Sequence, residues 1–141
     1  MTTKEYLQQI YQAQQKIKRL ERGREQLRAN LYSIGSPSGD LSPDKVQSSI
    51  TGDKMLKLIA RVDALEKDIV IEIARLTGLI KKISAEIERI PNNRYRNLLH
   101  DRYILTWKWE RIAVDMDVDI RHVYRLHGKA LQEFEKIRRS T

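Results

Sequence analysis

One apolar repeat, running from Met55 to Ile90, constrains the fold of this chain more than any other feature. Its positions are separated by alternating steps of four and three residues, which is typical of a helix that packs lengthwise against another helix. Ten of the eleven positions are apolar, and the exception is Glu66. Pro91 follows directly, and because proline disfavours helix at the residue before it, we expect the helix to end there. The repeat consists of Met55, Ile59, Val62, Glu66, Ile69, Ile73, Leu76, Ile80, Ile83, Ile87 and Ile90.

A weaker stripe of the same kind precedes this repeat, between Lys4 and Tyr32. Arg24 occupies one of its positions, and the segment contains no proline and a single glycine, Gly23. The spacing predicts one long helix in which Gly23 is a weak point. The apolar positions are Tyr6, Ile10, Ala13, Ile17, Leu20, Leu27 and Leu31.

The segment between the two stripes, residues 33–53, is rich in serine, glycine and proline. Pro37 and Pro43 forbid a continuous helix, although Ser42 as N-cap and Pro43 at the first helical position could begin a short helical turn. The segment therefore predicts a loop that joins two helices. Residues 1–91 would then form a long antiparallel helical hairpin.

The isoleucine repeat is longer and more apolar than the first stripe, so the first helix cannot cover all of it. We therefore expect a homodimer through the long helices; the alternative is a monomeric bundle closed by the C-terminal part of the chain. Arg24 and Glu66, which both occupy seam positions, could pair across the hairpin or fix its register, or could lie at frayed edges.

Residues 92–141 carry a different pattern, in which short helices alternate with turns. Asn92 or Asn93 can cap a helix that bears Leu98, Leu99 and Tyr103. After a break at "ILTWK", a short helix carries Trp109, Ile112, Ala113 and Met116. The turn "MDVD" places Asp119 to cap a final helix, residues 119–139, whose inward face is Val123, Leu126, Ala130, Leu131 and Phe134. Two short helices joined by a tight turn predict a helix-turn-helix within an all-α fold.

The final helix carries a row of hydrogen-bond donors outside its apolar face. In a helix-turn-helix the second helix enters the major groove of DNA, and arginine suits the paired acceptors of guanine. The net charge of +8 and the pI near 9.8 also favour nucleic acid as a partner, although a solvated basic face is the simpler alternative. We expect the following residues to read bases: Arg121, His122, Tyr124 and Arg125. Contacts to phosphates are expected from Lys108, Arg111 and Lys129.

Residues 98–134, "LLHDRYILTWKWERIAVDMDVDIRHVYRLHGKALQEF", resemble region 4 of bacterial sigma-70 factors. The chain as a whole is similar to ArpU-type transcriptional regulators, which are phage-encoded proteins of Gram-positive hosts. The resemblance implies a sequence-specific regulator, an activator of phage or prophage genes. Asp119 replaces the usual serine cap, and Arg111 replaces a glutamate, which weakens any inference of a polymerase contact. The matching positions are Arg102-Tyr103, Ile112-Ala113, Val118, Val123 and Ala130-Leu131.

Two other functions remain open at this point. Small terminase subunits, which recognise DNA for phage packaging, also join a helix-turn-helix to an oligomerising coil, but usually with the DNA-binding part first. A protein that binds host RNA polymerase and no DNA is the other. A measurement of the oligomeric mass would distinguish the terminase alternative, because a packaging ring needs many more than two subunits. DNA binding by the C-terminal segment would distinguish the polymerase-binding alternative.

Catalysis and metal binding find little support in the residues. His122 and His127 are five apart, so they cannot chelate one metal as a pair four apart would. "DMDVD" imitates the start of a calcium loop, but Ile120 stands where glycine is required and Leu126 where glutamate is required. We therefore expect no enzyme activity, no cofactor and no metal.

The composition and the first residues bear on the compartment. The chain has no cysteine, which excludes disulfides and thiolate metal sites and suits a reducing cytoplasm. The first residues, "MTTKEYLQQI", lack the pattern of a signal peptide, and no apolar run approaches the roughly 20 residues of a membrane span. We expect a protein of the bacterial host cytoplasm without a membrane partner.

Overall fold

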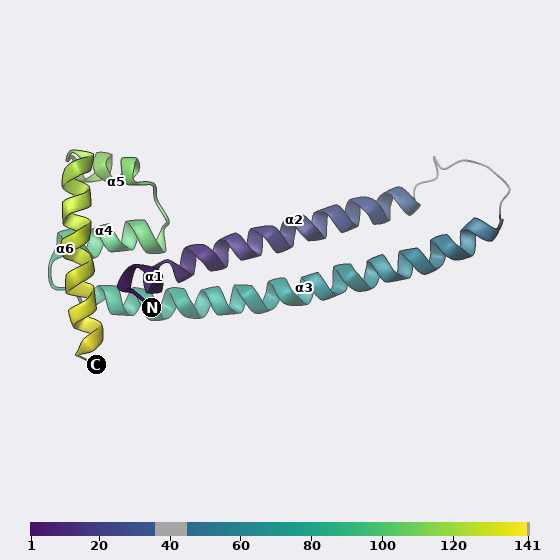
Figure 1. The fold of residues 1–141 in the computed structure, drawn as a ribbon, viewed down its shortest axis with the longest axis horizontal. Helices are drawn as coiled ribbons and strands as arrows, with labels where there is room; N and C mark the ends of the chain where they lie inside the picture. The colour runs from purple at the N-terminus through teal and green to yellow at the C-terminus, as the bar shows by residue number, and fades with distance from the viewer. Residues whose placement is uncertain (36–44, 141) are drawn as a thin grey trace. The chain divides into compact units, whose positions relative to one another are not determined.

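The computed structural model describes the backbone of residues 1–35 and 45–140, and within them the side chains of residues 1–34 and 52–140. The described residues form helices and no strands, which confirms the all-α class. Figure 1 follows the helices along the chain. They are α1 (Thr3–Leu7), α2 (Gln9–Gly35), α3 (Lys45–Glu88), α4 (Asn93–Leu99), the π-helix η1 (His100–Ile104), α5 (Trp109–Met116) and α6 (Ile120–Arg139).

The two long helices extend further than the sequence predicts. α2 continues to Gly35 and α3 begins at Lys45, so both ends of the expected loop, residues 33–53, are helical. Serine and glycine lower helix stability by about 1 kcal/mol or less each, which a long cooperative helix tolerates. The expected helical turn at Ser42 and Pro43 lies outside the described residues.

The first stripe forms two helices where the sequence predicts one. α1 and α2 are separated at Gln8, whereas Gly23 does not interrupt α2. Thr2 caps α1, because its hydroxyl accepts a hydrogen bond from the Glu5 N–H at 3.1 Å while the Glu5 carboxylate accepts one from the Thr2 N–H at 3.0 Å. Leu7, which lies off the predicted stripe, is fully buried.

The chain divides into two compact units, one of residues Met1–Gln14 and Arg75–Thr141 and the other of residues 15–74. Both α2 and α3 pass from one unit to the other. This division differs from the predicted boundary at residue 91, because the first residues of the chain and the last turns of α3 contribute to the core around α4, α5 and α6.

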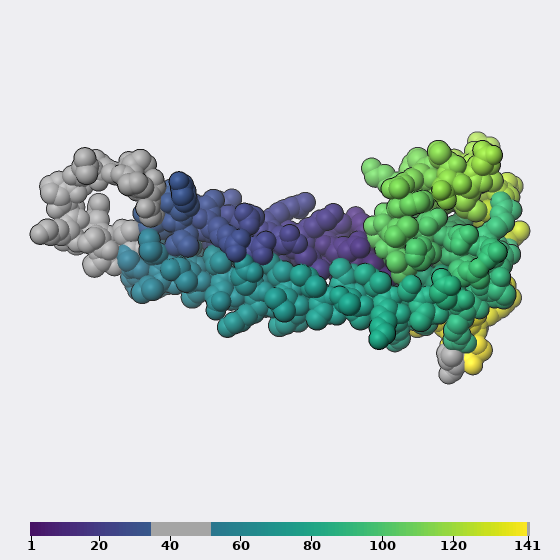
Figure 2. All heavy atoms as spheres, turned by 180° about the vertical axis from the view of Figure 1, so that it is seen from behind, coloured from purple at the N-terminus to yellow at the C-terminus, as the bar shows by residue number. Residues whose placement is uncertain are grey.

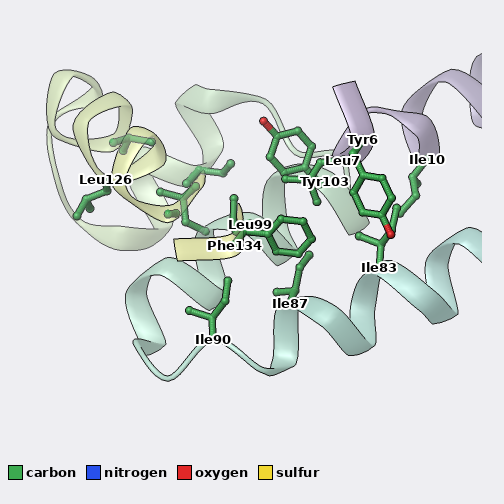
Figure 3. Packing of buried hydrophobic residues seen from close by; sticks show 14 of the residues in the cluster. Tyr6, Leu7, Ile10, Ile83, Ile87, Ile90, Leu99, Tyr103, Leu126 and Phe134 are labelled. Atoms are coloured by element: carbon green, nitrogen blue, oxygen red, sulfur yellow. The ribbon is translucent and has the colours of Figure 1, made fainter. Parts of the chain in front are cut away.

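The core of the first unit joins segments that are far apart in the sequence (Figure 3). The Tyr6 ring lies 6.1 Å from the Phe134 ring, between centroids, and the Arg138 guanidinium lies 3.5 Å from the Tyr6 centroid. The Tyr6 hydroxyl donates a hydrogen bond to the Glu86 carboxylate, which also lies 3.6 Å from Nε of Arg138. α1 is thereby fixed to α3 and α6. The buried residues of this core are Tyr6, Leu7, Ile10, Ile83, Ile87, Ile90, Leu98, Leu99, Tyr103, Ile112, Ala113, Val123, Leu126, Ala130 and Phe134.

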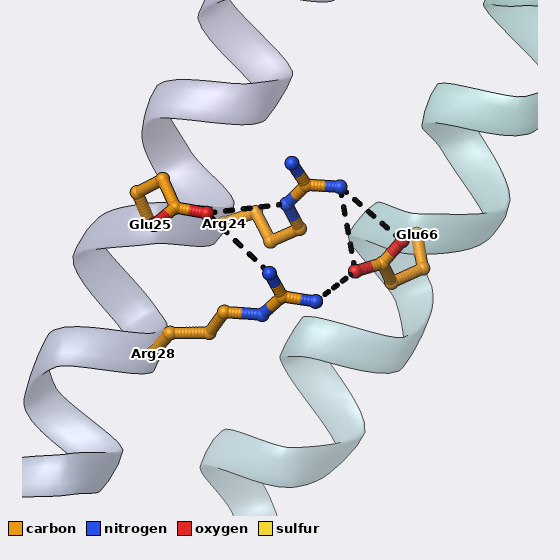
Figure 4. A network of polar contacts seen from close by, with 4 residues as sticks. All are labelled: Arg24, Glu25, Arg28 and Glu66. Carbon is orange, nitrogen blue, oxygen red and sulfur yellow. Dashed lines mark hydrogen bonds and ion pairs between the residues drawn. The ribbon is translucent and has the colours of Figure 1, made fainter.

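In the second unit α2 and α3 run antiparallel and are linked by ion pairs. An Nη atom of Arg24 lies 3.4 Å from the Glu66 carboxylate, and an Nη atom of Arg28 lies 2.6 Å from it (Figure 4). Lys16 pairs with the buried Glu72 at 2.9 Å. The predicted pairing of Arg24 with Glu66 across the two helices is confirmed. In the space-filling view of Figure 2, the atoms of the two helices lie against each other within this unit.

Candidate nucleic-acid interface

A tight turn separates α5 from α6. Asp117 adopts the left-handed conformation, with φ 55° and ψ 47°, which aspartate tolerates better than most residues. The N–H groups of Asp117 and Val118 bond back to Val114 and Ala113 carbonyls, both at 3.1 Å, and so satisfy the end of α5. The turn is held by its backbone.

Asp119 occupies the N-cap position of α6, as the sequence predicts, but its side chain makes no capping hydrogen bond. Its carbonyl instead accepts from the N–H groups of His122 and Val123, at 3.0 and 3.1 Å. The expectation that the Asp119 carboxylate caps the helix is therefore wrong. The exposed carboxylate remains free to be solvated near the N-terminal end of the helix, where negative charge is favourable.

α6 has a buried face and an opposite, cationic face. Four residues at helical spacing are buried: Val123, Leu126, Ala130 and Phe134. Leu131, which the sequence also assigns to the inward face, is half-buried. The opposite side exposes the side chains that the sequence predicts as readers, namely Arg121, Tyr124, Arg125 and Lys129. We call these four residues the α6 outer row.

His122 differs from the rest of the predicted readers because it is half-buried at the edge of the α6 outer row. Its Nδ1 lies 3.3 Å from an Nη atom of Arg125, and the roles of donor and acceptor depend on the tautomer of the ring. Tyr124 keeps 48% of its surface exposed. The two side chains therefore flank Arg125 on the same stretch of helix.

Two of the residues predicted to contact phosphates lie outside α6, one at the start of α5 and one within it. Lys108 is the exposed N-cap residue of α5. Arg111 is exposed one turn later, and its guanidinium stacks 3.8 Å from the Trp107 centroid. This cation–π contact orients the Arg111 side chain without neutralising its charge.

A cluster of aromatic rings, formed by Tyr103, Trp109 and His127, packs against Tyr124 of the α6 outer row. The Trp109 ring packs edge-on against Tyr124 and His127, with centroid distances of 5.5 and 4.6 Å. The Tyr103 hydroxyl lies 2.6 Å from Nε2 of His127. The Arg102 guanidinium also packs on Trp109, 4.3 Å from the centroid of its ring.

Burial determines the charge states in this cluster. It lowers the pKa of His127 to about 4, with smaller contributions from the positive charges of Lys4 and Arg102. It also raises the pKa of Tyr103 to about 12. At neutral pH the imidazole is therefore uncharged and the phenol protonated. The Tyr103 hydroxyl donates to Nε2 of His127 when the ring proton is on Nδ1, and accepts from Nε2 in the other tautomer.

Arg102 and the first residues of the chain are part of this region, although helical periodicity did not assign them to it. Arg102 donates a hydrogen bond to the Trp107 carbonyl at 2.8 Å, and Thr106 between them has a φ of 58°. A cavity of about 380 Å³ is lined by Gln8, Tyr11, Arg102, Tyr103, Thr106 and Lys108. The Arg-Tyr dipeptide of the motif was the one sequence signal that could have pointed to Arg102.

Among the described residues, no group of three or more histidine, cysteine, aspartate or glutamate side chains is placed to hold a metal ion. Within the same residues, no helix combines the length and apolar character that crossing a membrane requires. Comparison of the chain with protein-family models, with curated proteins and with solved structures gives no significant match.

Proposed function

We propose that this chain is a DNA-binding transcriptional regulator whose α5 and α6 act as a sigma-70 region 4-like helix-turn-helix, with α6 in the major groove. The observation that carries the proposal is the α6 outer row, a set of exposed donors on a helix whose opposite face is buried. The resemblance to ArpU-type regulators extends it to activation of phage or prophage genes in the cytoplasm of a bacterial host.

The roles of the residues follow from their chemistry and exposure. Arg121 and Arg125, which are four residues apart and both exposed, present forked donors that match the O6 and N7 acceptors of guanine. Tyr124 and His122 lie beside them and offer further contacts to base edges. Three cations flank this set and would hold phosphates, namely Lys108, Arg111 and Lys129.

Self-association through the long helices is part of the proposal. A single helix-turn-helix makes few base contacts, and two of them on one scaffold gain affinity through effective concentration without any new contact. The exposed apolar side chains of α3 in the second unit support it, since Leu56 and Val70 retain 67% and 65% of their surface.

The test begins with selection of bound sequences from a random duplex library by the full-length protein. Binding of the selected duplex and of a scrambled duplex is then measured by fluorescence anisotropy. Arg125→Ala should lower affinity for the selected duplex by about 1–3 kcal/mol and leave the scrambled duplex nearly unaffected, because a bidentate arginine discriminates bases. Lys129→Ala should weaken both duplexes alike and reduce the salt slope by about 1.

Arg61→Ala is the matched control, because Arg61 is an exposed arginine of α3 in the second unit and its removal changes the net charge equally. It should leave both affinities nearly unchanged. Equal losses on selected and scrambled DNA for Arg125→Ala would show that the reading face is misassigned. Failure to enrich any sequence would favour an interaction protein that binds RNA polymerase alone.

A further inference from the structure

The second unit exposes an apolar face on α3 that, apart from Ile59, lies outside the apolar repeat of this helix. Leu58 and Ile69 of α3 are buried in this unit, whereas four large apolar side chains of the helix are exposed in addition to Ile73. At 3.6 residues per turn, these four lie within about 60° of one line along the helix, together with two alanines and one Asp–Lys pair. The eight residues, which we call the α3 outer face, are Leu56, Ile59, Ala60, Asp63, Lys67, Val70, Ile71 and Ala74.

The exposure of this face is large. Leu56, Val70 and Ile71 retain 67%, 65% and 63% of their surface, and Ile59 retains 46%. Exposed apolar side chains of this kind on a helix, in two groups separated by one Asp–Lys pair, are typical of an interface. The Asp63 carboxylate lies 3.5 Å from the Lys67 ammonium, and both side chains are mostly exposed at the middle of the face.

The order of these eight residues is symmetric. Their successive spacings are three, one, three, four, three, one and three, which read the same from either end. When two copies of α3 are placed antiparallel and cross at residue 65, Leu56 of one copy lies opposite Ala74 of the other, and Ala60 lies opposite Val70. Each of these pairs joins a large residue to a small one. The same arrangement places Ile59 opposite Ile71, and Asp63 opposite Lys67.

We propose that the α3 outer face binds the same face of a second copy of this chain, with the two α3 helices antiparallel and the two-fold axis at residue 65. An isologous interface must be complementary to itself, and the pairing of large with small apolar residues and of Asp63 with Lys67 meets this condition. The two Asp63–Lys67 pairs across the axis provide the charge complementarity. This inference rests on the proposed self-association and assigns it a surface and a direction, but it does not depend on DNA binding.

Charge also selects the antiparallel direction. In a parallel pair, Asp63 would lie opposite Asp63 and Lys67 opposite Lys67, so like charges would meet at the centre of the interface. Such juxtapositions disfavour the wrong arrangement more strongly than the correct pairs stabilise the right one. The same logic provides a test, because a single charge reversal converts the favourable pairs into unfavourable ones.

The experiment measures the dimer dissociation constant of the full-length protein by sedimentation equilibrium without DNA. Asp63→Lys alone and Lys67→Asp alone should each weaken the dimer at least tenfold, because all four central charges then have one sign. An equimolar mixture of the two variants, and the protein with both substitutions, should restore association to near the wild-type value. Helical circular dichroism should be unchanged, because both side chains are exposed.

Lys57→Asp is the matched control. Lys57 forms an equivalent pair with Asp53 at 3.5 Å on the same helix, but it lies about 100° round the helix from the α3 outer face, so its reversal should leave association unchanged. A wild-type dimer that neither single variant weakens would overturn the assignment of this surface while leaving self-association intact. A wild type that is monomeric at tens of micromolar would overturn both, and DNA binding by the monomer would remain open.

Direction is tested by spin labels, since the chain has no native cysteine. In the antiparallel dimer, labels at Ala64→Cys lie close to the axis, whereas labels at Asp53→Cys are displaced along the helices by about 36 Å, at 1.5 Å per residue. A parallel dimer would give similar short distances at both sites. Short distances at residue 53 would therefore overturn the proposed arrangement.

Discussion

His127 should give the folding stability a specific dependence on pH. Burial lowers its pKa to about 4 in the folded protein, whereas an unfolded histidine titrates near about 6.5. Between these values the unfolded chain binds a proton that the folded protein does not. Stability is therefore fully present above about pH 6.5 and is lost as the pH falls towards 4.

The magnitude follows from the same shift. Between pH 7 and pH 5, a change from about 6.5 to about 4 corresponds to about 2 kcal/mol of unfolding free energy. The ring is only half-buried, so solvent screening should reduce the observed loss to about 1 kcal/mol. Burial also raises the pKa of Asp101, which acts in the opposite direction. That contribution is shared by any variant that retains Asp101.

The assay is urea unfolding of the wild type and of His127→Gln at pH 7 and pH 5. Glutamine keeps a hydrogen-bond acceptor for the Tyr103 hydroxyl but does not titrate. The wild type should lose about 1 kcal/mol more than the variant on acidification. If both proteins lose the same amount, His127 is not held neutral by burial, and the described role of the Tyr103–His127 bond is wrong.

Two further predictions concern the first unit. Trp109→Ala should lower the free energy of unfolding by about 2 kcal/mol in urea, because Trp109 packs against two rings of α6. Trp107→Ala should lower it by less, and the reverse order would contradict this packing. The isolated fragment of residues 92–141 lacks six of the fifteen buried residues of the core. It should therefore show no cooperative unfolding transition. A folded fragment would show that α1 and α3 are not needed for this core.

The helical stripes account for most of what the sequence alone could predict. The steps of four and three placed Ile69, Ile83, Ile87 and Ile90 on one face, and the structure buries all four. Ile59 and Ile73 of the same repeat remain exposed, at 46% and 47%. Arg24 and Glu66 share the seam and pair across it. Such features are local or nearly periodic, so spacing alone reveals them.

The composition of the first unit could not be predicted in the same way. Leu7 is fully buried although it lies off the stripe, because the core that receives it is formed by α3 and α6. The contact of Tyr103 with His127 joins two helices across an irregular segment in which Thr106 has a positive φ. Periodicity describes one helix at a time, so contacts across turns are outside what it can predict.

The residues of the candidate site show the same difference between features of one helix and contacts across turns. The α6 outer row followed from its place opposite the buried face, and Arg121 and Arg125 are exposed as expected. Arg102, by contrast, belongs to the candidate site because it contacts Trp109. That contact depends on the conformation of the irregular segment between η1 and α5, which spacing does not predict. The predicted carboxylate cap of Asp119 is absent, and the N–H of His122, which such a cap could bind, bonds to the Asp119 carbonyl.

The most direct test of the central claim is photocrosslinking of the full-length protein to its selected duplex carrying 5-iodouracil in place of thymine. The C5 substituent of thymine projects into the major groove, and Tyr124 is an exposed aromatic side chain between Arg121 and Arg125. If α6 reads the groove, mass spectrometry should locate the crosslink on the α6 segment around Tyr124. Specific binding with crosslinks only to α2 or α3 would contradict the proposed interface.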